Sequence, residues 1–499
     1  MKRNIISPEK HGLAVANNSE SNILKVTSPC DGTVIAELAV DTGQTLAYKI
    51  AQAKKAQEKW QNNPRGEREK LLTAFSDAII ANKKKLTDLV IYDAGKTEKE
   101  AGSEVTGSAD ILKKTIELSA LPELNGMLRY KERPPVGVVG LITSFNFPVA
   151  VAHWTIAPAL LAGNAVIWKP SEKTPIIGPA IKEIFDSVAG EYGDLLQIII
   201  GGRDIGSRLV GHEQVDMISA TGSVAMGQGI KAALAEKHNN SITPILELGG
   251  NNGVIISEKI TDEHLQFAVN SIMGSFLATS GQRCTNTRRL IVQKKIYDKV
   301  VSSLKQNIEK FLTSGAIVNP LSGASNDYGY AVLIDEDSFQ RFESAKKQAL
   351  IEGGEIVFGS RLKVGDASNV FFVEPALALM SKQSEIMHKE TFAPLLFIAP
   401  YDKFSEAIEL VNAPENAGLV CGIYTQNKEE AEIFVRENQA GHCVINSPKG
   451  TGTPAFGMGF GGNKHSGEGE ILNNSDPLQA FTRPGKFNRI AVNSATEWL

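Results

Sequence analysis

The sequence predicts an α/β protein built on two parallel sheets, and three observations support this fold class. Short apolar runs of strand length, such as 135–143 and 164–170, alternate with helical stretches such as 148–163. These runs are apolar along nearly their whole length, which is typical of a parallel sheet that helices cover on both faces. The alternation begins again near residue 253, so a second α/β unit should follow the first.

The part of the chain before the first strand is expected to be helical, from about residue 46 to residue 120. Apolar residues recur there at three- and four-residue spacing, over 47–60 and 69–92. Helices are also expected between the strands, for example at 148–163 and 223–237. The first sheet should take its strands from the apolar runs at 135–143, 164–170, 195–200, 215–221 and 244–250.

The second unit should run from about residue 253 to residue 460, with no low-complexity linker before it. Its clearest helical patterns lie at 264–280 and 403–412, and its clearest strands at 253–257, 288–293 and 395–401. The tail, 476–499, ends in alternating apolar residues that could form an edge strand. In a protein with two such sheets, the functional site is expected in the cleft between the units.

Composition and charge exclude several classes of protein. The chain has 499 residues, of which 42% are hydrophobic and 22% charged, so it can bury sizeable cores. Its formal net charge is −4 with the two signs mixed throughout, which argues against a nucleic-acid binder. No apolar run is long enough to span a bilayer and the N-terminus lacks an apolar signal region, so a soluble cytoplasmic protein is expected. The four cysteines show no CxxC spacing, so neither a disulfide framework nor a metal site is expected.

Cys284 stands in an unusual setting, in "FLATSGQRCTNTRRLIV" at 276–292. It should lie in the loop between a helix and the strand at 288–293. Backbone amides and the adjacent Arg283 could lower the pKa of its thiol and favour the reactive thiolate. The alternative is a buried and inert cysteine, which suits Cys421 and Cys443 better because both lie in apolar, strand-like segments.

Two polar residues next to predicted strands are further candidates for chemistry. Glu247 ends an apolar strand in "LELGGNN", where burial would raise the pKa of its carboxyl and suit it as a general base. Asn146, in "SFNFPVAVAHW", could donate its amide to a developing oxyanion. The alternatives are a structural glutamate satisfied by loop amides and a helix-capping asparagine.

A further group of residues follows strands of the first sheet and suits a nucleotide. Lys169 and Glu172, in "WKPSEKTP", could both bond ribose hydroxyls. The glycine-bearing segments 201–206 and 220–227 each lead from a strand into a helix, and a helix N-terminus near Ser223 would favour a phosphate. Neither segment is a GxGxxG fingerprint, so spacing alone is weak support for a dinucleotide.

The order of six motifs resembles the aldehyde dehydrogenase superfamily. "FNFP" at Asn146 is followed by "KPSE", "TGS", "ELGG", "GQRC" and "ETFAP", the last at 390–394. The likeness extends from about residue 46 to "GFGGNKHSG" at 459–467. The resemblance implies an aldehyde dehydrogenase-like fold with a Rossmann-type NAD-binding domain, a second α/β catalytic domain and a small oligomerisation hairpin. On this basis the domains should be 1–116 with 136–247, then 248–466, with oligomerisation elements at 117–135 and 475–499.

The resemblance also implies roles for individual residues. Cys284 would be the nucleophile that attacks an aldehyde carbonyl, and Glu247 the base that activates water for release of the acid. Asn146 and the backbone amide of Cys284 would form the oxyanion hole. The cofactor would be NAD, and the protein a homodimer or homotetramer. The residues implied in cofactor binding are Thr143, Ser144, Lys169, Glu172, Gly202, Gly206, Thr221, Gly222, Ser223, Leu248, Gly249, Glu390 and Phe392.

Within the superfamily the chain is most similar to the antiquitin-like group, which oxidises α-aminoadipate semialdehyde. "LELGGNNGVII", "GQRCTNTRRL" and "ETFAP" carry that likeness, which implies substrate binding by Glu104, Phe147 and Arg283. Departures such as "NDYGYAVLID" and "SGEGEILNN" leave other aldehydes open, and Arg283 could instead brace its loop. A CoA-acylating enzyme is a rival, although that branch lacks the glutamate seen at Glu247. A catalytically silent protein on the same scaffold is another.

Overall fold

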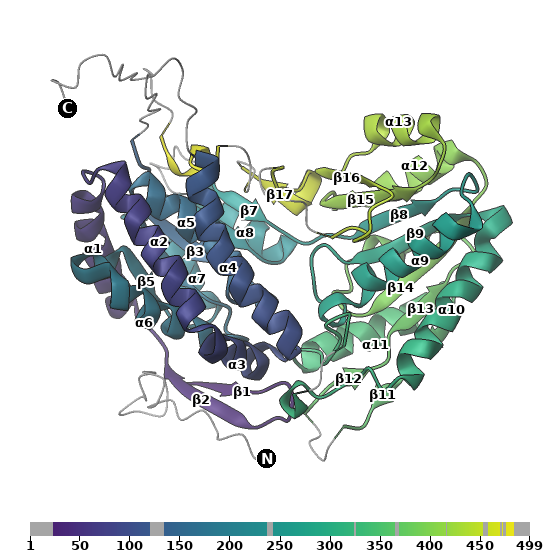
Figure 1. The fold of residues 1–499 in the computed structure, drawn as a ribbon, viewed down its shortest axis with the longest axis horizontal. Coiled ribbons are helices and arrows are strands. Elements are labelled where there is room, and N and C mark those ends of the chain that lie inside the picture. The colour runs from purple at the N-terminus through teal and green to yellow at the C-terminus, as the bar shows by residue number, and fades with distance from the viewer. Residues whose placement is uncertain are drawn as a thin grey trace.

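The computed structural model shows two lobes, each built around one sheet (Figure 1). It describes residues 23–119, 134–236, 243–323, 326–364, 369–415, 417–452, 458–469, 472 and 476–483. The expected oligomerisation hairpin therefore lies mostly outside the described residues, as does the tail after residue 483. Within the described ranges, no helix combines the length and the apolar character needed to cross a membrane.

The first sheet has the strand order β17-β7-β6-β3-β4-β5. The five strands predicted from the sequence are present and parallel to one another, and β17 adds an antiparallel edge. Their bounds are β3 (Val138–Ile142), β4 (Ala165–Lys169), β5 (Leu196–Ile198), β6 (Met217–Thr221), β7 (Ile245–Glu247) and β17 (Gly467–Glu468).

Helices cover this sheet, and the long helical stretch expected before it is divided. Asn82 has non-helical torsion angles and ends one helix while it begins the next, and Gly95, at φ 68°, ends the second. The helices of this lobe are α1 (Gly43–Trp60), α2 (Arg65–Ala81), α3 (Lys83–Ala94), α4 (Glu98–Ser119), α5 (Ala150–Ala162), α6 (Ile177–Ala189), α7 (Arg203–Gly211) and α8 (Val224–Ala235).

An antiparallel hairpin of β1 (Ile23–Thr27) and β2 (Val34–Ala39) precedes the helices and was not predicted. It lies at the bottom of the view in Figure 1, below the helices of the first lobe.

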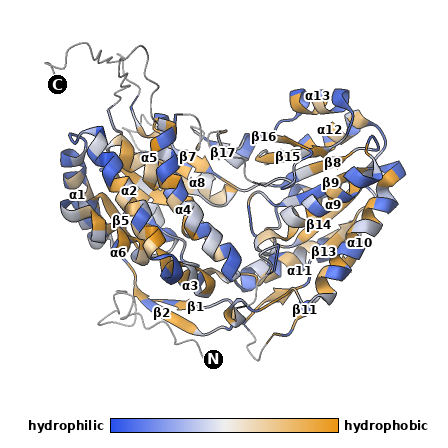
Figure 2. Ribbon diagram, in the orientation of Figure 1, coloured by the Kyte–Doolittle hydropathy of each residue, from blue (hydrophilic) through white to orange (hydrophobic). Residues whose placement is uncertain are grey.

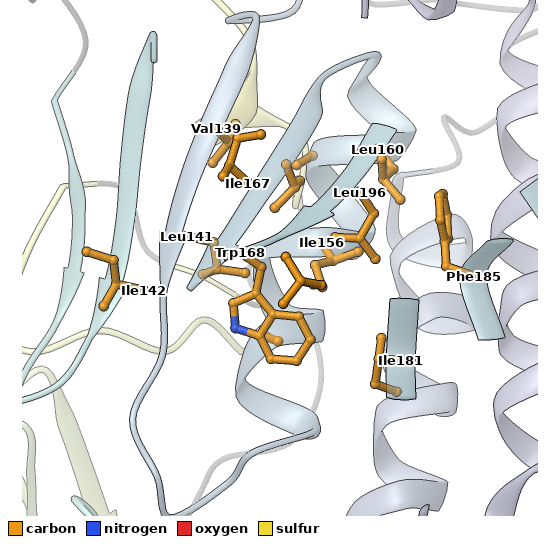
Figure 3. Close-up of a cluster of buried hydrophobic side chains, with 14 of the residues drawn as sticks. Val139, Leu141, Ile142, Ile156, Leu160, Ile167, Trp168, Ile181, Phe185 and Leu196 are labelled. Atoms are coloured by element: carbon orange, nitrogen blue, oxygen red, sulfur yellow. The ribbon is translucent and has the colours of Figure 1, made fainter. Parts of the chain in front are cut away.

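The core of the first lobe forms between the sheet and its helices (Figure 3). Trp168 on β4 is fully buried, and its indole lies near Leu141 and Ile156 in Figure 3. The other side chains labelled there are buried as well. Burying an apolar side chain of this size contributes roughly 1.5–3 kcal/mol. The indole N–H of Trp168 donates to Thr143 Oγ1 over 2.9 Å, so the polar atom is satisfied and the end of β3 is fixed.

The second sheet has the order β10-β13-β14-β9-β8-β15-β16, parallel except for the antiparallel edge strand β10. Figure 2 shows its strands as predominantly apolar, with polar residues on the flanking helices. The strands are β8 (Asn252–Ile256), β9 (Thr287–Gln293), β10 (Glu355–Phe358), β13 (Ala376–Leu379), β14 (Leu395–Tyr401), β15 (Val420–Tyr424) and β16 (His442–Ile445). The helices are α9 (Asp262–Leu277), α10 (Tyr297–Thr313), α11 (Glu336–Ile351), α12 (Phe404–Asn412) and α13 (Lys428–Glu437), and a short pair is formed by β11 (Arg361–Leu362) and β12 (Phe372–Val373).

The two sheets are joined directly by residues 248–251, between β7 of the first and β8 of the second. Glu247 stands at the end of β7, while the loop that carries Cys284 leads into β9, the neighbour of β8. The topology therefore brings both residues to the junction of the lobes.

Candidate active site

The loop that carries Cys284 begins with a turn of unusual conformation. Helix α9 ends at Leu277, and Thr279, Ser280 and Gly281 then have φ values of 52°, 54° and 71°. This left-handed conformation costs an L-residue about 1–2 kcal/mol and is rarest for a β-branched residue such as threonine. Surrounding contacts hold it in place, including a hydrogen bond of 2.8 Å from Ala331 N to Ser280 Oγ.

Two asparagines fix the rest of the loop. Asn286 Oδ1 accepts from Arg283 N at 2.5 Å, and Asn286 Nδ2 donates to Ala278 O at 3.1 Å. Asn252 Nδ2 donates to Cys284 O at 2.7 Å and to Asn286 O at 2.8 Å. The backbone on both sides of the cysteine is therefore held by buried side chains.

The Cys284 thiol has the opposite electrostatic character from the one expected. Its pKa is raised to about 12, mainly by burial and in addition by the charges of Glu390 and Glu247, while Arg288 acts to lower it. Arg283 does not provide the expected activation, because its guanidinium faces away toward Glu100 Oε1 at 2.8 Å. At neutral pH the thiol is protonated in this structure, so its proton must leave before the sulfur can attack.

Glu247 is buried, and its Oε2 has no hydrogen-bond partner among the described residues. Burial raises the pKa of this carboxyl well above its usual value, which confirms the effect expected from sequence. An unpartnered carboxylate oxygen can accept a proton or bind a water molecule.

Asn146 is tied to the cysteine loop by its side-chain amide. Nδ2 donates to the carbonyl oxygen of Gln282 at 2.8 Å, and Oδ1 accepts from Ser144 Oγ at 2.8 Å. The second hydrogen of Nδ2 is left to donate elsewhere. The alternative role as a helix cap does not apply, because the capping position of α5 is Val149.

Glu390 and Phe392 lie against the same junction. Glu390 Oε1 accepts from Gly250 N at 3.0 Å, and burial raises the pKa of its carboxyl to about 7 against the opposing effect of Arg288. Phe392 has a left-handed φ of 54°. Its ring centroid lies 5.8 Å from that of Phe145 and 5.4 Å from the guanidinium carbon of Arg288.

Lys169 and Glu172 form a polar pair after β4. Lys169 is buried, and its Nζ lies 3.1 Å from Glu172 Oε2, while the Glu172 side chain remains 48% exposed. Burial acts to raise the pKa of Glu172, but Lys169 and neighbouring groups outweigh it and the pKa is lowered. Gly202 begins α7, and a Cβ at Gly206 would lie in ordinary contact with the Lys169 side chain.

A second group of predicted cofactor residues surrounds the start of α8. Thr221 ends β6, Gly222 N donates to Glu247 O at 3.0 Å, and Ser223 is the N-cap of the helix. Leu248 packs over Gly227, where a Cβ would lie 2.3 Å from its Cδ1. The predicted helix start at Ser223 is confirmed, and its backbone N–H groups form the kind of site that binds phosphate.

The contacts of Glu104 do not fit the substrate-binding role expected for it. Its side chain is 1% exposed, Oε2 lies 2.7 Å from Lys96 Nζ, and Oε1 accepts from Val149 N at 2.8 Å and Ala150 N at 3.1 Å. The carboxylate therefore joins α4 to the start of α5 and is already fully paired.

Glu100, one helical turn before Glu104, was missed in the sequence. Its Oε1 pairs with Arg283, while Oε2 is buried without a hydrogen-bond partner among the described residues. Phe147 lies beside this pair, with its ring centroid 5.2 Å from the Arg283 guanidinium carbon and 3.9 Å from Lys96 Nζ. Residues four apart share one helix face, so helical spacing from Glu104 could have pointed to Glu100.

Comparisons with known proteins place the chain in a family. Residues 15–485 match the model of the aldehyde dehydrogenase family. The alpha-aminoadipic semialdehyde dehydrogenase of Bos taurus is 30% identical over 92% of this chain and 84% of its own length. An NADP-dependent glyceraldehyde-3-phosphate dehydrogenase from Bacillus halodurans, solved with NADP, is 27% identical with a TM-score of 0.81, over 95% of this chain and 99% of that one.

An indole-3-acetaldehyde dehydrogenase of P. syringae, solved with NAD+, is 25% identical with a TM-score of 0.82, over 94% of this chain and 93% of that one. The fold, the ordered motifs and the family match agree over most of the chain. The chain therefore belongs to the aldehyde dehydrogenase family and is an oxidoreductase that acts on aldehydes.

Proposed function

We propose that the protein oxidises an aldehyde to the free carboxylic acid with NAD as acceptor, through a thioester on Cys284. The observation that carries the proposal is the convergence of three loops. Asn146 bonds the backbone two residues before Cys284, and the charge of Glu247 acts on the Cys284 thiol. Nucleophile, oxyanion donor and base thus lie at one junction.

The residues around α8 and after β4 fit a dinucleotide. The N-terminus of α8 at Ser223 would hold the pyrophosphate, and Lys169 with Glu172 the adenosine ribose. Glu390 and Phe392 would lie on the nicotinamide side. Bound NAD supplies the acceptor for the hydrogen and two electrons that leave the aldehyde carbon. The half-exposed Glu172 can accept bonds from two ribose hydroxyls but would repel a 2′-phosphate, so we expect a lower KM for NAD than for NADP.

The chemical steps follow from the side chains present. The Cys284 thiol passes its proton to solvent water, and the thiolate sulfur bonds to the aldehyde carbon while the carbonyl π electrons move to the oxygen. The negative charge on that oxygen is stabilised by Asn146 Nδ2 and the Cys284 amide. Loss of hydrogen and two electrons from the carbon leaves a thioester. Glu247 then takes a proton from water, the hydroxyl adds to the thioester, and the carbon–sulfur bond breaks to release acid and free the sulfur.

We further propose that the substrate carries a distal amino acid end, as α-aminoadipate semialdehyde does. Arg283 is adjacent to the nucleophile, and its side chain is 30% exposed. Nε donates to Thr279 Oγ1 and Nη2 to Glu100 Oε1, so Nη1 and the second hydrogen of Nη2 remain to bind a substrate carboxylate. The unpartnered Oε2 of Glu100 can accept an ammonium group. In this proposal Glu100 takes the role that the resemblance gave to Glu104.

The proposal extends to domains and assembly. Residues 1–116 and 136–247 would form the cofactor domain, 248–466 the catalytic domain, and 117–135 with 475–499 the contacts of a homodimer or homotetramer. Light scattering at micromolar concentration should give a multiple of the 53.7 kDa chain mass. A monomeric mass would contradict this part of the proposal.

The test of function is a panel of aldehydes assayed with NAD, with and without CoA, together with Cys284→Ala. We expect NAD reduction without CoA, release of free acid, and the highest kcat/KM with a semialdehyde that has both distal charges. An absolute requirement for CoA, or turnover by Cys284→Ala, would contradict the proposed mechanism.

A further inference from the structure

Arg288, the second residue of β9, is buried next to the cysteine loop. Its Nη1 donates to Gly281 O at 2.6 Å and to Ala393 O at 3.0 Å, and its Nη2 donates to Arg283 O at 2.8 Å. Gly281 and Arg283 lie directly before Cys284, whereas Ala393 follows Phe392. One guanidinium group therefore fastens the nucleophile loop to the loop at 390–394.

The same group reaches a third loop through Phe392. The Arg288 guanidinium lies over the Phe392 ring, and that ring also contacts Phe145, next to Asn146, edge to face. Phe392 holds a left-handed backbone conformation, which persists only where neighbours impose it. Arg288 thus contacts the loops of Cys284 and Glu390 directly, and Phe392 links it to the loop of Asn146.

Arg288 forms no direct ion pair with a carboxylate among the described residues, although the charge of Glu390 acts on it. Its hydrogen bonds in the described part of the chain all go to neutral carbonyl oxygens, and Nε has no partner there. Its positive charge is felt by nearby ionisable groups instead: it lowers the pKa of the Cys284 thiol and of the Glu390 carboxyl against burial.

We propose that Arg288 is a positioning residue that locks the nucleophile loop onto the loop at 390–394 and places a positive charge against the backbone of the nucleophile loop, where it favours the thiolate of Cys284. This rests on the nucleophilic role proposed above for Cys284. The sequence had suggested Arg283 for the electrostatic part, but that side chain is engaged with Glu100.

Arg289 provides a matched control in the same strand. It is equally buried and hydrogen-bonded, but its partners are Asn251 O at 3.1 Å, Gln383 Oε1 at 3.0 Å, Leu410 O at 2.9 Å and Val411 O at 3.1 Å. Adjacent strand residues point to opposite faces of a sheet, so Arg289 is turned away from the contacts of Arg288. Removing either side chain removes a buried guanidinium, but only one change affects the cysteine loop.

The experiment compares Arg288→Gln, Arg288→Lys, Arg289→Gln and Cys284→Ala. Alkylation of Cys284 by iodoacetamide is followed by peptide mass spectrometry between pH 7 and pH 10 without substrate, and the burst of NADH with aldehyde is measured separately. We expect Arg288→Gln to slow alkylation roughly threefold to tenfold at each pH. Loss of the positive charge should raise the pKa of the Cys284 thiol by about one unit and lower the fraction of thiolate, while the remaining thiolate is more nucleophilic and offsets part of this loss. Arg289→Gln should leave the alkylation rate unchanged at each pH.

Arg288→Lys keeps the charge but cannot reach all of the carbonyls. We expect its alkylation rate to stay close to that of the wild type and its burst rate to fall about tenfold, because the loop is less well positioned. If Arg288→Gln does not fold, this variant decides: an unchanged burst overturns the proposal and a reduced burst supports it.

Failure of the inference and failure of the proposed function are distinguishable. If folded Arg288→Gln is alkylated at the wild-type rate while Cys284→Ala is inactive, the role of Arg288 is overturned and the proposed function is left intact. Turnover by Cys284→Ala would overturn the function itself, and the inference with it.

Discussion

At the residue scale, the site brings together three ionisable groups whose pKa values are all raised. Burial is the main cause for Cys284, whose pKa is about 12, for Glu390, whose pKa is about 7, and for Glu247. Negative charge on Glu390 or Glu247 acts on the thiol pKa in the same direction as burial. Such groups titrate as a set, so loss of one proton makes the next loss harder.

Glu247→Gln should separate the two halves of the reaction. We expect a burst of NADH close to stoichiometric with enzyme and then steady turnover slower by ~10²–10⁴, because a general base serves only the release of acid. In the wild type, steady turnover should rise with pH as Glu247 loses its proton, and the variant should lose that dependence. Rapid-mixing and steady-state assays check this, and equal slowing of burst and steady state would remove Glu247 from the role.

The same substitution should affect stability in a definite direction. The folded-state pKa of Glu247 is raised above its unfolded value, so its contribution to stability is greatest below the unfolded pKa and is lost as pH rises. Glu247→Gln has no such loss. The Tm of the variant relative to wild type should therefore increase from pH 5 to pH 8 in calorimetry, and a decreasing difference would contradict the assignment of a raised pKa.

Glu100→Gln and Glu104→Gln form a matched pair on one helix face. We expect Glu100→Gln to lose roughly tenfold to a hundredfold in kcat/KM with an amino-bearing semialdehyde and little with an uncharged aldehyde of similar length. Glu104→Gln leaves buried Lys96 without its closest partner, so it should cost about 3–5 kcal/mol of stability and affect both substrates alike. Kinetics on the two substrates and denaturant unfolding check this pair. If Glu104→Gln lowered kcat/KM only with the amino-bearing semialdehyde, Glu104 would again be assigned to the substrate site.

At the element scale, Asn146, Lys169, Ser223 and Glu247 lie at strand ends or in the turns after them, while Cys284 lies in the loop between α9 and β9. Gly249 and Gly250 follow β7 and let two other loops approach the backbone closely. A Cβ at Gly249 would lie 2.3 Å from Glu390 Oε2, and one at Gly250 would lie 2.4 Å from Cys284 O. These glycines are needed for close packing of loops rather than for a turn.

Gly250→Ala should therefore disturb the nucleophile loop. The backbone oxygen of Cys284 cannot move without breaking its bond from Asn252, so we expect a fall in kcat of at least tenfold and a loss of about 1–3 kcal/mol in stability. Gly107→Ala, in the interior of α4 with open space around it, is the control and should stabilise by about 0.5–1 kcal/mol. Steady-state kinetics and thermal unfolding compare the two, and unimpaired turnover by Gly250→Ala would show that the loop can shift freely.

The sequence predicted these elements where periodicity and apolar runs are local. The five strands of the first sheet and the loop position of Cys284 were found because each depends on a few consecutive residues. The direction of the Glu104 and Arg283 side chains was not found, because it depends on partners such as Lys96 and Glu100 in packed elements. The left-handed turn at Thr279 and Ser280 was missed for the same reason, since neither residue type signals that conformation.

At the scale of the whole molecule, the two lobes are held together by a segment that returns from the second sheet to the first. After β16 the chain reaches Ser466 and then forms β17 on the edge of the first sheet, against β7. Figure 1 shows β17 between the two lobes. The residues that link the sheets, 248–251, are therefore contacted by this returning segment, which is a second crossing of the chain between the lobes.

Ser466 makes the central contacts of this returning segment. Its Oγ donates to Gly249 O at 2.7 Å and accepts from Gly418 N at 2.9 Å, and its backbone O accepts from Leu248 N at 2.8 Å. Ser466→Ala leaves a buried carbonyl and a buried N–H unpaired, so we expect a loss of about 1–3 kcal/mol in the free energy of unfolding. Ser466 also fixes Gly249, which adjoins both Glu390 and the end of β7. We therefore expect kcat to fall by a larger factor than the factor by which KM changes. Ser303→Ala, on an exposed face of α10, should change neither, and denaturant unfolding with steady-state kinetics checks both variants. If Ser466→Ala lost stability but kept full kcat, the returning segment would hold the lobes together without setting the geometry of the site.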